Sequence, residues 1–272
     1  MKNKTPLVLF FAPAMTVFAA FFILPLGRLA VESAGGPEGL AIYSRVVSNP
    51  RYLKTLLDTM LISVLVTCAA VAMGGITGLF LERNSFRGRA FLVALLTLPI
   101  SFPGVVVGFM IIMLAGRQGL VGQLTNVLTG SRLVFAYSAP GLFAGYLYFS
   151  IPRVVATVMA AAGEMDMSLE EAARVLGASP WRVFLDVTAP SLAPALVSTG
   201  AVCFATSVGA FGTAFTLAAD LNVLPVVIYT EFTLSANIVT AAMLSIVLGL
   251  VAWAALLLAR MFAGPFAAGG SA

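Results

Sequence analysis

The sequence predicts an all-α membrane protein with six transmembrane helices. Its composition, the length of its apolar segments and one polar stretch between two of them support this prediction. Of the 272 residues, 60% are hydrophobic and only 10% are charged, whereas soluble globular chains are close to a quarter charged. The chain has no histidine, so neither imidazole catalysis nor a metal site is expected. Its basic residues are scattered over the loops, so nucleic-acid binding is not expected either.

The first span is expected over residues 6–26, a charge-free segment after Lys2 and Lys4 that is long enough to cross a bilayer. It is longer than the apolar core of a cleavable signal peptide, so we expect a retained helix with its basic end in the cytoplasm. Residues 28–58 are polar and contain glycine and proline, which predicts an external loop. A short interfacial helix is expected within this loop, near residues 40–47.

The second span, residues 59–81, and the third span, residues 90–115, are separated by an arginine-rich turn that favours the cytoplasmic side. Pro99 and Pro103 interrupt the third span, and each proline removes a backbone hydrogen-bond donor. A broken helix beside a transport path and a harmless kink are both consistent with this pattern. Residues 117–132, which follow, are expected to form a second external loop.

The fourth span, within residues 133–162, contains Pro152 and Arg153. An arginine at that depth is costly unless it is paired, hydrated or extended toward the membrane surface. Arg153 therefore either snorkels to the cytoplasmic face or lines the transport path. Pro152 joins Arg153 and the two prolines of the third span as a candidate pathway residue. The fifth and sixth spans are expected over residues 195–219 and 237–259.

Residues 168–190, between the fourth and fifth spans, form a polar stretch that we call the polar island. Ser168 stands three residues before Glu171, which is the spacing of a capping box and predicts that a helix begins there. Gly177 follows a run of helix formers, at a place where a left-handed residue can end the helix. The island is thus expected to begin with one short helix that ends in an elbow.

A second short helix is expected to begin at Ser179-Pro180, with serine as the N-cap and proline at the first helical position. Pro190 is expected to end it. Several apolar side chains of the two helices would face water, namely Ala172, Ala173, Leu176, Trp181 and Phe184. Apolar residues on an ordered, exposed knob indicate a docking partner.

The spacing of residues in the island resembles the EAA loop of ABC-importer permeases, the inner-membrane components of binding-protein-dependent transport systems. The family pattern is EAA, three residues, G, nine residues, I, one residue, L, P. The matching residues are Glu171, Ala172, Ala173, Gly177, Val187, Ala189 and Pro190. Val187 and Ala189 replace isoleucine and leucine, and both remain apolar. The order and lengths of the spans extend the resemblance over roughly residues 55–260.

The resemblance implies a type I importer-permease fold in a bacterial inner membrane, with both termini in the cytoplasm. The island would be the cytoplasmic coupling helix between spans four and five that docks on an ATPase. The implied coupling residues are Glu171, Ala172, Ala173, Gly177, Ala178, Ser179, Pro180, Trp181 and Pro190. The implied division of the chain is a first helix and loop (1–54), a permease core (55–260) and a flexible cytoplasmic tail (261–272).

The resemblance also implies that the chain is not an enzyme and binds no cofactor. Two copies of a separate ATPase would bind ATP and Mg²⁺, and a second permease and a periplasmic solute-binding protein would complete the importer. The absence of a G-x-x-x-x-G-K-[S/T] phosphate loop from the sequence agrees with this division of labour.

The cargo stays open among the substrates of the branch that this chain resembles most: polyamines, ferric iron, phosphonates, sulfate or thiamine. A dication would prefer an acidic lining, but no acidic residue lies in mid-span. The alternative function is a secondary transporter driven by an ion gradient, which would show ionisable groups near the bilayer centre or an inverted repeat. A membrane enzyme would need a cluster of catalytic groups, and a scaffold would need no transport path.

Overall fold

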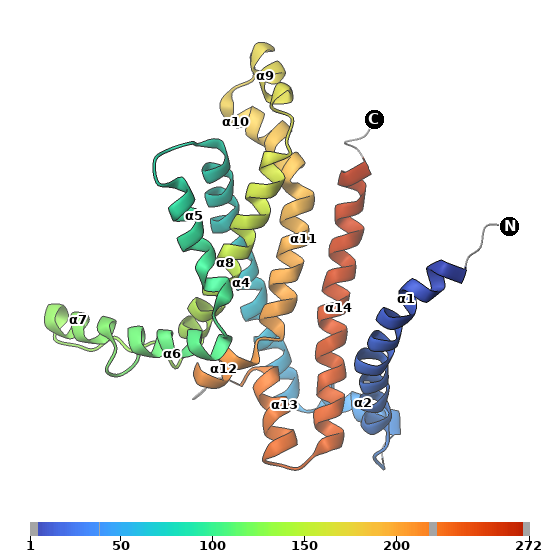
Figure 1. Ribbon diagram of the computed structural model, residues 1–272. Helices are drawn as coiled ribbons and strands as arrows, with labels where there is room; N and C mark the ends of the chain where they lie inside the picture. Colours follow the sequence, from blue (N-terminus) through green and yellow to red (C-terminus); the bar gives the residue numbers. More distant parts are fainter. Residues whose placement is uncertain (1–4, 38, 218–221, 269–272) are drawn as a thin grey trace. The chain divides into compact units, whose positions relative to one another are not determined.

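The computed structural model describes residues 5–37, 39–217 and 222–268, and the regular secondary structure in these ranges is entirely helical (Figure 1). Lys2 and Lys4 lie outside the described residues. Among the described residues, six helical stretches are long and apolar enough to cross a membrane: Phe11–Ala34, Pro50–Arg83, Gly104–Thr129, Ala139–Gly163, Pro180–Val208 and Ile238–Met261. The prediction of an all-α protein with six spans is therefore confirmed.

The first of two compact units contains residues 1–54 and 227–249. Its N-terminal elements are α1 (Thr5–Phe18), the π-helical turn η1 (Ala19–Ile23), α2 (Leu24–Ala34), the 3₁₀ turn η2 (Gly39–Ser44) and α3 (Arg45–Ser48). The short helix expected near residues 40–47 is present as η2 and α3. Glu231 is buried in this unit, where it accepts a hydrogen bond from Tyr52 at 3.2 Å and pairs with Arg51 at 3.8 Å.

The second unit contains residues 55–226 and 250–272. Its centre is formed by α4 (Pro50–Arg83), α8 (Ala139–Gly163) and α11 (Ala189–Val208). Helices α4 and α8 approach closely, because a Cβ atom added to Gly78 would lie only 2.9 Å from the carbonyl oxygen of Val155. The three helices share one buried apolar cluster: Ala70, Val154, Val158, Ala162, Leu192 and Cys203.

The third span differs from the expected single helix over residues 90–115. Helix α5 (Arg89–Thr97) runs into the 3₁₀ turn η3 (Leu98–Ser101), and α6 (Gly104–Ala115) begins after a break. Pro99 lies at the start of η3, and Pro103 directly precedes α6. Proline is tolerated where a helix begins, because the N–H groups there have no carbonyl partner within that helix. The prolines therefore break the helix and do not merely bend it.

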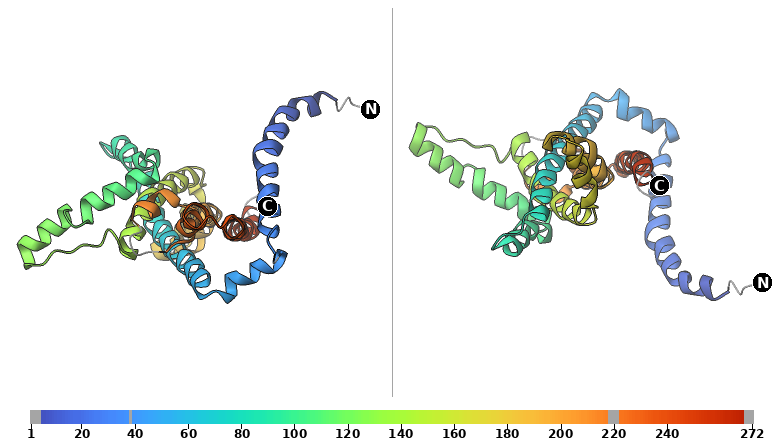
Figure 2. Two further views of the ribbon diagram at one scale, coloured as in Figure 1. Left: turned by 90° about the horizontal axis from the view of Figure 1, so that it is seen from below. Right: turned by 90° about the horizontal axis from the view of Figure 1, so that it is seen from above.

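The segment after the break also differs from the prediction. Residues 117–132 were expected to be an external loop, but they contain α7 (Leu120–Thr129). Together α6 and α7 extend away from the group formed by α4, α8 and α11, as Figures 1 and 2 both show. The sequence pattern located the break but gave no information about the direction of the chain beyond it.

The fifth and sixth spans begin and end differently from the prediction. Helix α10 (Pro180–Val183), the π-helical turn η4 (Phe184–Thr188) and α11 form one continuous helix that ends at Val208. The short α12 (Phe211–Leu217) follows, and residues 218–221 lie outside the described residues. Helix α13 (Leu224–Thr233) is short, and α14 (Ile238–Ala268) continues through most of the segment expected to be a flexible tail.

Candidate functional site

The polar island lies between the fourth and fifth candidate spans, where α9 (Met167–Val175) and α10 project past the ends of α8 and α11 (Figure 1). The N-cap of α9 is Asp166, whose carboxylate accepts a hydrogen bond from the Ser168 N–H at 2.9 Å. This bond lowers the pKa of Asp166. The prediction that Ser168 begins the helix was therefore wrong, because a carboxylate two residues earlier satisfies the free N–H groups.

Glu170 is the most deeply buried charged residue of the island, with 1% of its surface exposed. Thr188 donates its hydroxyl hydrogen to Glu170 Oε1 at 2.6 Å, and Arg83 donates to the same oxygen. Arg174, one turn along α9, lies 3.5 Å from the other carboxylate oxygen. We call these four residues the Glu170 cluster. It joins the end of α4, the middle of α9 and the turn η4 that leads into α11.

The Glu170 cluster keeps its carboxylate ionised. Burial by itself raises the pKa of Glu170, but the opposing influences are larger in sum. These are the hydrogen bonds from Thr188 and Arg83 and the positive charges of Arg83 and Arg174, so the pKa lies below its usual range. At neutral pH the cluster therefore holds one carboxylate between two guanidinium groups. This arrangement ties α9 to the end of α4 and to the turn η4 that leads into α11.

The elbow after α9 has the predicted left-handed conformation, with φ = 85° at Gly177. The Gly177 N–H donates to the Arg174 carbonyl at 3.0 Å, and the Ala178 N–H donates to the Ala173 carbonyl at 3.1 Å. This pair of bonds is the Schellman motif, which satisfies the last carbonyls of a helix. A Cβ atom at Gly177 would meet nothing within 4 Å, so backbone conformation, not lack of space, calls for glycine here.

The second helix of the island begins as predicted. The Ser179 side chain caps it by accepting from the Arg182 N–H at 3.4 Å, and Pro180 occupies its first turn. The ring of Trp181 stacks on that of Phe184 at a centroid distance of 5.6 Å. Trp181 is nevertheless 68% exposed, so the stack presents a rigid aromatic surface to the outside of the chain.

Pro190 does not end this helix, contrary to the prediction. The chain passes through η4, where the Ala189 N–H bonds to the carbonyl of Phe184, five residues back. A π-helical turn is wider than an α-helical turn, so it relieves the clash of a proline ring with the preceding turn. Within this continuous helix, the Ser191 hydroxyl donates to the Val187 carbonyl at 2.7 Å.

The outer surface of the island is exposed and largely apolar. Val175 and Leu176 each expose 87% of their surface, and Glu171 and Ala172 are exposed as well. No described residue forms a hydrogen bond or ion pair with the Glu171 side chain. The predicted coupling residues thus divide into an exposed set around Glu171 and Trp181 and a set that shapes the backbone, Gly177, Ser179 and Pro180.

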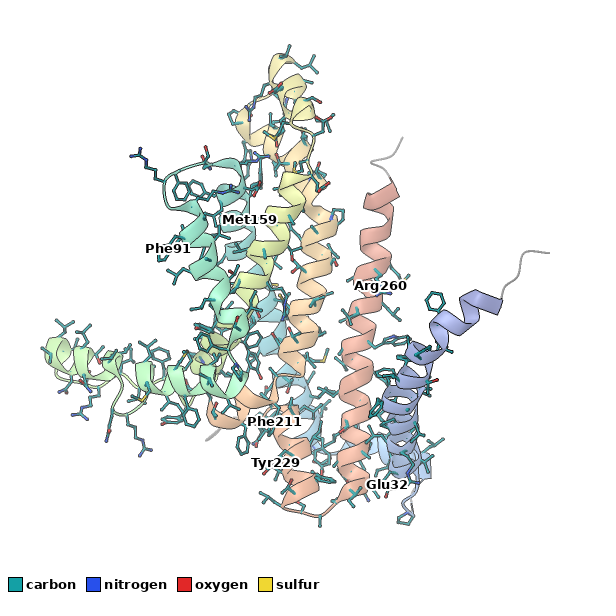
Figure 3. The ribbon with its side chains drawn as sticks, in the orientation of Figure 1. Glu32, Phe91, Met159, Phe211, Tyr229 and Arg260 are labelled. Atoms are coloured by element: carbon teal, nitrogen blue, oxygen red, sulfur yellow. The ribbon has the colours of Figure 1, made fainter. Side chains whose placement is uncertain are left out.

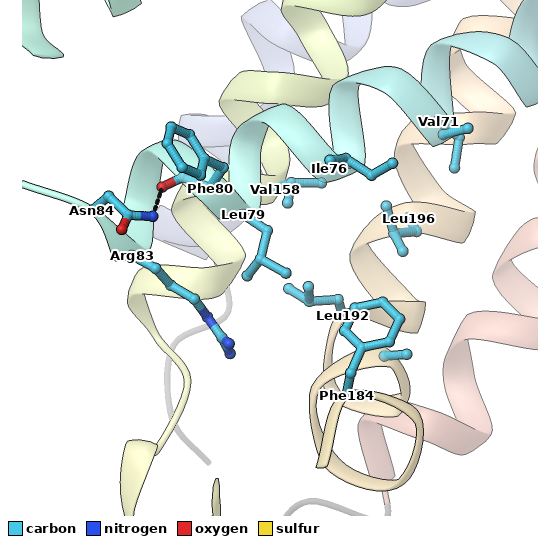
Figure 4. Close-up of a pocket in the computed structure, with 13 residues that line it drawn as sticks. Val71, Ile76, Leu79, Phe80, Arg83, Asn84, Val158, Phe184, Leu192 and Leu196 are labelled. Carbon is cyan, nitrogen blue, oxygen red and sulfur yellow. Dashed lines mark hydrogen bonds between the residues drawn. The ribbon is translucent and has the colours of Figure 1, made fainter. Parts of the chain in front are cut away.

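An apolar groove of about 500 Å³ borders the island, and Figure 4 shows its lining. Ile76 and Phe80 of α4 form one wall, and Leu192 and Leu196 of α11 lie across from them. Arg83 and Asn84 lie at one end, where the Asn84 side chain donates to the Phe80 carbonyl at 2.8 Å. Arg83 therefore touches both the groove and the Glu170 cluster.

Of the candidate pathway residues, Arg153 lines a pocket elsewhere in the second unit, whereas Pro99, Pro103 and Pro152 are not among the residues that line it. Pro152 is buried within α8, and the half-buried Arg153 donates from Nη1 to the Thr206 hydroxyl of α11 at 2.8 Å. Arg153 lines a pocket of about 280 Å³ with Phe149, Thr213 and residues of the break between η3 and α6. Figure 3 shows the side chains of the described residues and labels Phe211, at the start of α12. The structure thus brings Arg153 and the third-span break together.

Sequence reasoning missed Glu170 and chose its neighbour Glu171. The spacing of Glu170 and Arg174 by four residues is a helical ion-pair pattern and could have directed attention to it. Its partners Arg83 and Thr188 lie 87 and 18 positions away in the sequence, and no local pattern points to them.

Comparison with known proteins identifies the family. The model of the binding-protein-dependent transport system inner membrane component matches residues 70–264. A putative 2-aminoethylphosphonate transport system permease of Salmonella typhimurium is 28% identical over 90% of this chain and 88% of its own length. The molybdenum transport system permease of Escherichia coli K12 is 31% identical over 68% of this chain and 81% of its own. A chloroplastic sulfate permease of Chlamydomonas reinhardtii is 34% identical over 64% of this chain, which spans about half (47%) of that protein.

Solved structures agree on the fold. A chain of a bacterial alginate ABC transporter, in complex with its alginate-bound periplasmic protein, superposes with a TM-score of 0.81 at 17% identity, over 96% of this chain and 94% of that one. A chain of the MetNI methionine ABC transporter gives a TM-score of 0.60 over 79% and 95%. Permeases of this family are multi-pass inner-membrane subunits, bind no cofactor and rely on a separate ATPase. The chain belongs to the family of binding-protein-dependent transport system inner membrane components, the permease subunits of ABC importers.

Proposed function

We propose that this permease carries a small oxyanion of the sulfate, phosphonate or molybdate type from a periplasmic binding protein to the cytoplasm, with the polar island as its coupling element. The observation that carries the coupling role is the exposed, largely apolar surface of α9 and α10, whose helices are held by contacts within the chain. Trp181 and Leu176 are 68% and 87% exposed, yet the Schellman motif and the Trp181–Phe184 stack hold their helices in place. Such a surface is suited to docking.

The coupling step follows from the Glu170 cluster. Two ATPase subunits that close on ATP would move the island, and Glu171 on its outer face would meet a basic group of the ATPase. Because Glu170 bonds to both Arg83 and Thr188, a displacement of α9 is passed directly to the ends of α4 and α11. The island would therefore move these spans as one body, and not bend alone.

The assembly would contain a second permease, identical or different, with the transport path between the two. Both termini would lie in the cytoplasm, on the same side as the island. Pro99, Pro103, Pro152 and Arg153 would lie along the path, because helix breaks and a mid-span arginine are tolerated in a bilayer where they line a wet cavity. The names of the related permeases, for sulfate, 2-aminoethylphosphonate and molybdenum, favour an oxyanion over a polyamine or ferric iron.

The test of this function is affinity purification of the tagged full chain in mild detergent, with mass spectrometry of the proteins that co-purify. We expect an ATPase subunit with a phosphate loop, together with a second permease if the pair is heteromeric. Trp181→Ala and Glu171→Ala should each reduce the ATPase yield several-fold, because both residues lie on the proposed docking surface. Val127→Ala is the matched control, since Val127 is 83% exposed but lies on α7.

Two outcomes would overturn the proposal. The first is purification of the chain without an ATPase even after crosslinking from cysteines placed at Ala172 or Ser179, which would make a gradient-driven transporter the function to test. The second is equal co-purification of the ATPase with the wild type, Trp181→Ala and Glu171→Ala, which would place the docking surface outside the island.

A further inference from the structure

Arg153 is a charge inside the membrane-spanning part of the second unit that the described residues do not neutralise. Its guanidinium donates to a neutral group of α11, the Thr206 hydroxyl, at 2.8 Å. Among the described residues, no carboxylate lies within ion-pair distance of it. An arginine in a membrane span normally faces a counter-charge, a polar cavity or water.

The position of Arg153 along α8 excludes a simple escape to the membrane surface. Arg153 stands ten residues before the last residue of α8 (Ala139–Gly163), which is about 15 Å at the rise of an α-helix and about half the thickness of the hydrocarbon core. Side chains on a helix point toward its N-terminus, which for Arg153 is away from the island. The contact with Thr206 also holds the guanidinium against α11.

The pocket beside Arg153 is polar enough and large enough for a small anion. Its volume is about 280 Å³, roughly nine times the space that one water molecule takes in the liquid. Among the described residues that line it, none is acidic and Arg153 is the only charged one. Gly104 lines it where α6 begins, and the first-turn N–H groups of a helix lack carbonyl partners within that helix. The described lining therefore offers donors and positive charge but no negative charge.

We propose that this pocket is a binding site for one tetrahedral oxyanion, of the sulfate or phosphonate class, with Arg153 as its principal ligand. A guanidinium presents paired N–H groups that match two oxygens of such an anion, and Thr206 orients it. The pocket is too small for an oligosaccharide and carries the wrong charge for a polyamine. The inference rests on the proposed transport function. It adds that this chain itself recognises the anion, in addition to the recognition by the periplasmic binding protein.

The test is the thermal unfolding midpoint of the purified full chain in complex with its co-purifying ATPase, with probe anions added at constant ionic strength. We expect millimolar sulfate, molybdate and 2-aminoethylphosphonate to raise the midpoint by about 3 °C at tenfold excess over the dissociation constant, and spermidine to have no such effect. Sulfate also stabilises proteins by exclusion from their surface. The informative quantity is therefore the difference between the wild type and Arg153→Gln, which should lose the specific shift.

Two further variants complete the design. Arg87→Gln removes an exposed arginine in a loop and should keep the full shift. Arg153→Lys keeps the charge but not the paired N–H groups, so a reduced shift is expected, and this variant also serves if Arg153→Gln does not fold. An equal shift in the wild type and both Arg153 variants, or no shift in the wild type, would overturn the site. Co-purification of the ATPase, measured on the same samples, shows separately whether the importer assignment stands.

Discussion

Arg83 and Arg153 both lie where helices of the second unit meet, but the chain neutralises only one of them. Arg83 donates to Glu170, which is 1% exposed and also bonded to Thr188 and Arg174. Arg153 donates to the neutral Thr206 hydroxyl, and no carboxylate of the described residues lies within ion-pair distance of it. In the first arrangement the arginine has a carboxylate partner without any ligand, whereas the second leaves a positive charge beside an open pocket.

The same residue type thus serves two purposes: Arg83 stabilises the fold, whereas Arg153 is available to a ligand. A completed ion cluster fixes the relative positions of α4, α9 and η4, which suits the transmission of a movement. An uncompensated charge in a pocket costs stability in the empty protein, and a bound anion recovers that cost. The comparison therefore predicts that neutralising Arg83 lowers the stability of the fold, whereas neutralising Arg153 leaves the stability nearly unchanged or raises it.

The largest expected effect follows from neutralising Arg83. Arg83→Gln leaves the buried Glu170 with Thr188 and the partly exposed Arg174 alone, and loss of one partner of a buried pair costs about 3–5 kcal/mol. We expect about 2 kcal/mol, because these two partners remain and the Arg83 side chain is itself 29% exposed. Arg153→Gln removes a charge that has no carboxylate partner among the described residues, so it should change stability by less than about 0.5 kcal/mol or raise it.

Equilibrium unfolding of both variants in mixed micelles measures these changes. The exposed Arg87→Gln serves as the control for loss of one positive charge. Equal destabilisation by Arg83→Gln and Arg153→Gln would mean that the Arg153 contacts to α11 are as structural as the Glu170 cluster, and the distinction between the two regions would fail.

Some features of the island could be predicted from the sequence because they depend on neighbouring residues only. Gly177 after a run of helix formers gave the left-handed elbow, and Ser179-Pro180 gave the start of the next helix. The start of α9 was misplaced because two capping candidates, Asp166 and Ser168, lie two residues apart, and sequence spacing favoured the wrong one. Local rules cannot rank two such capping residues reliably, since the stabilisation that each gives to the helix differs by less than about 1 kcal/mol.

Other features depend on contacts that are remote in sequence. Glu170 and Glu171 are adjacent and chemically alike, but only one faces Arg83, 87 positions away. Pro99 and Pro103 marked an interruption of the third span in the sequence, but a break and a kink both stayed open, and the outward course of α6 and α7 was not indicated. Pro190 was expected to end a helix, and the π-helical turn before it could not be anticipated from residue types.

The second prediction concerns the elbow and uses the matched glycine at the end of α7. Gly177 and Gly130 have φ values of 85° and 73°, and a Cβ atom at either would meet nothing within 4 Å. Valine should therefore strain each position by a similar amount, about 1–2 kcal/mol. We expect Gly177→Val to remove most substrate uptake while the protein stays in the membrane, and Gly130→Val to leave uptake nearly unchanged.

Uptake of labelled substrate into cells, normalised to the amount of permease in the membrane, distinguishes the two variants. Gly177→Pro should act at least as strongly, because proline fixes φ near −65° and removes the N–H that bonds to the Arg174 carbonyl. Similar uptake by the Gly177 and Gly130 valine variants would show that the elbow has no role in coupling.

The smallest expected effect is the pH dependence of the Glu170 cluster. Because the pKa of Glu170 is lowered in the folded protein from its ordinary value of 4.5, the cluster stabilises the fold fully above that value. The stabilisation is lost as the pH falls through the lowered pKa, since protonation then favours the unfolded state. We expect the unfolding midpoint to decline below about pH 4.5, with a shallower decline in Glu170→Gln, which has no carboxylate to protonate.

The control for this decline is Glu171→Gln, which removes an exposed neighbour and should leave the slope of the wild type. The pKa of Asp166 is also lowered, so part of the decline persists in Glu170→Gln and only the difference between the two curves reports on the cluster. Parallel curves for the wild type and Glu170→Gln between pH 6 and pH 3 would show that Glu170 gains no net stabilisation from ionisation. In that case Arg83 would resemble Arg153 as a charge that the chain tolerates but does not use for stability.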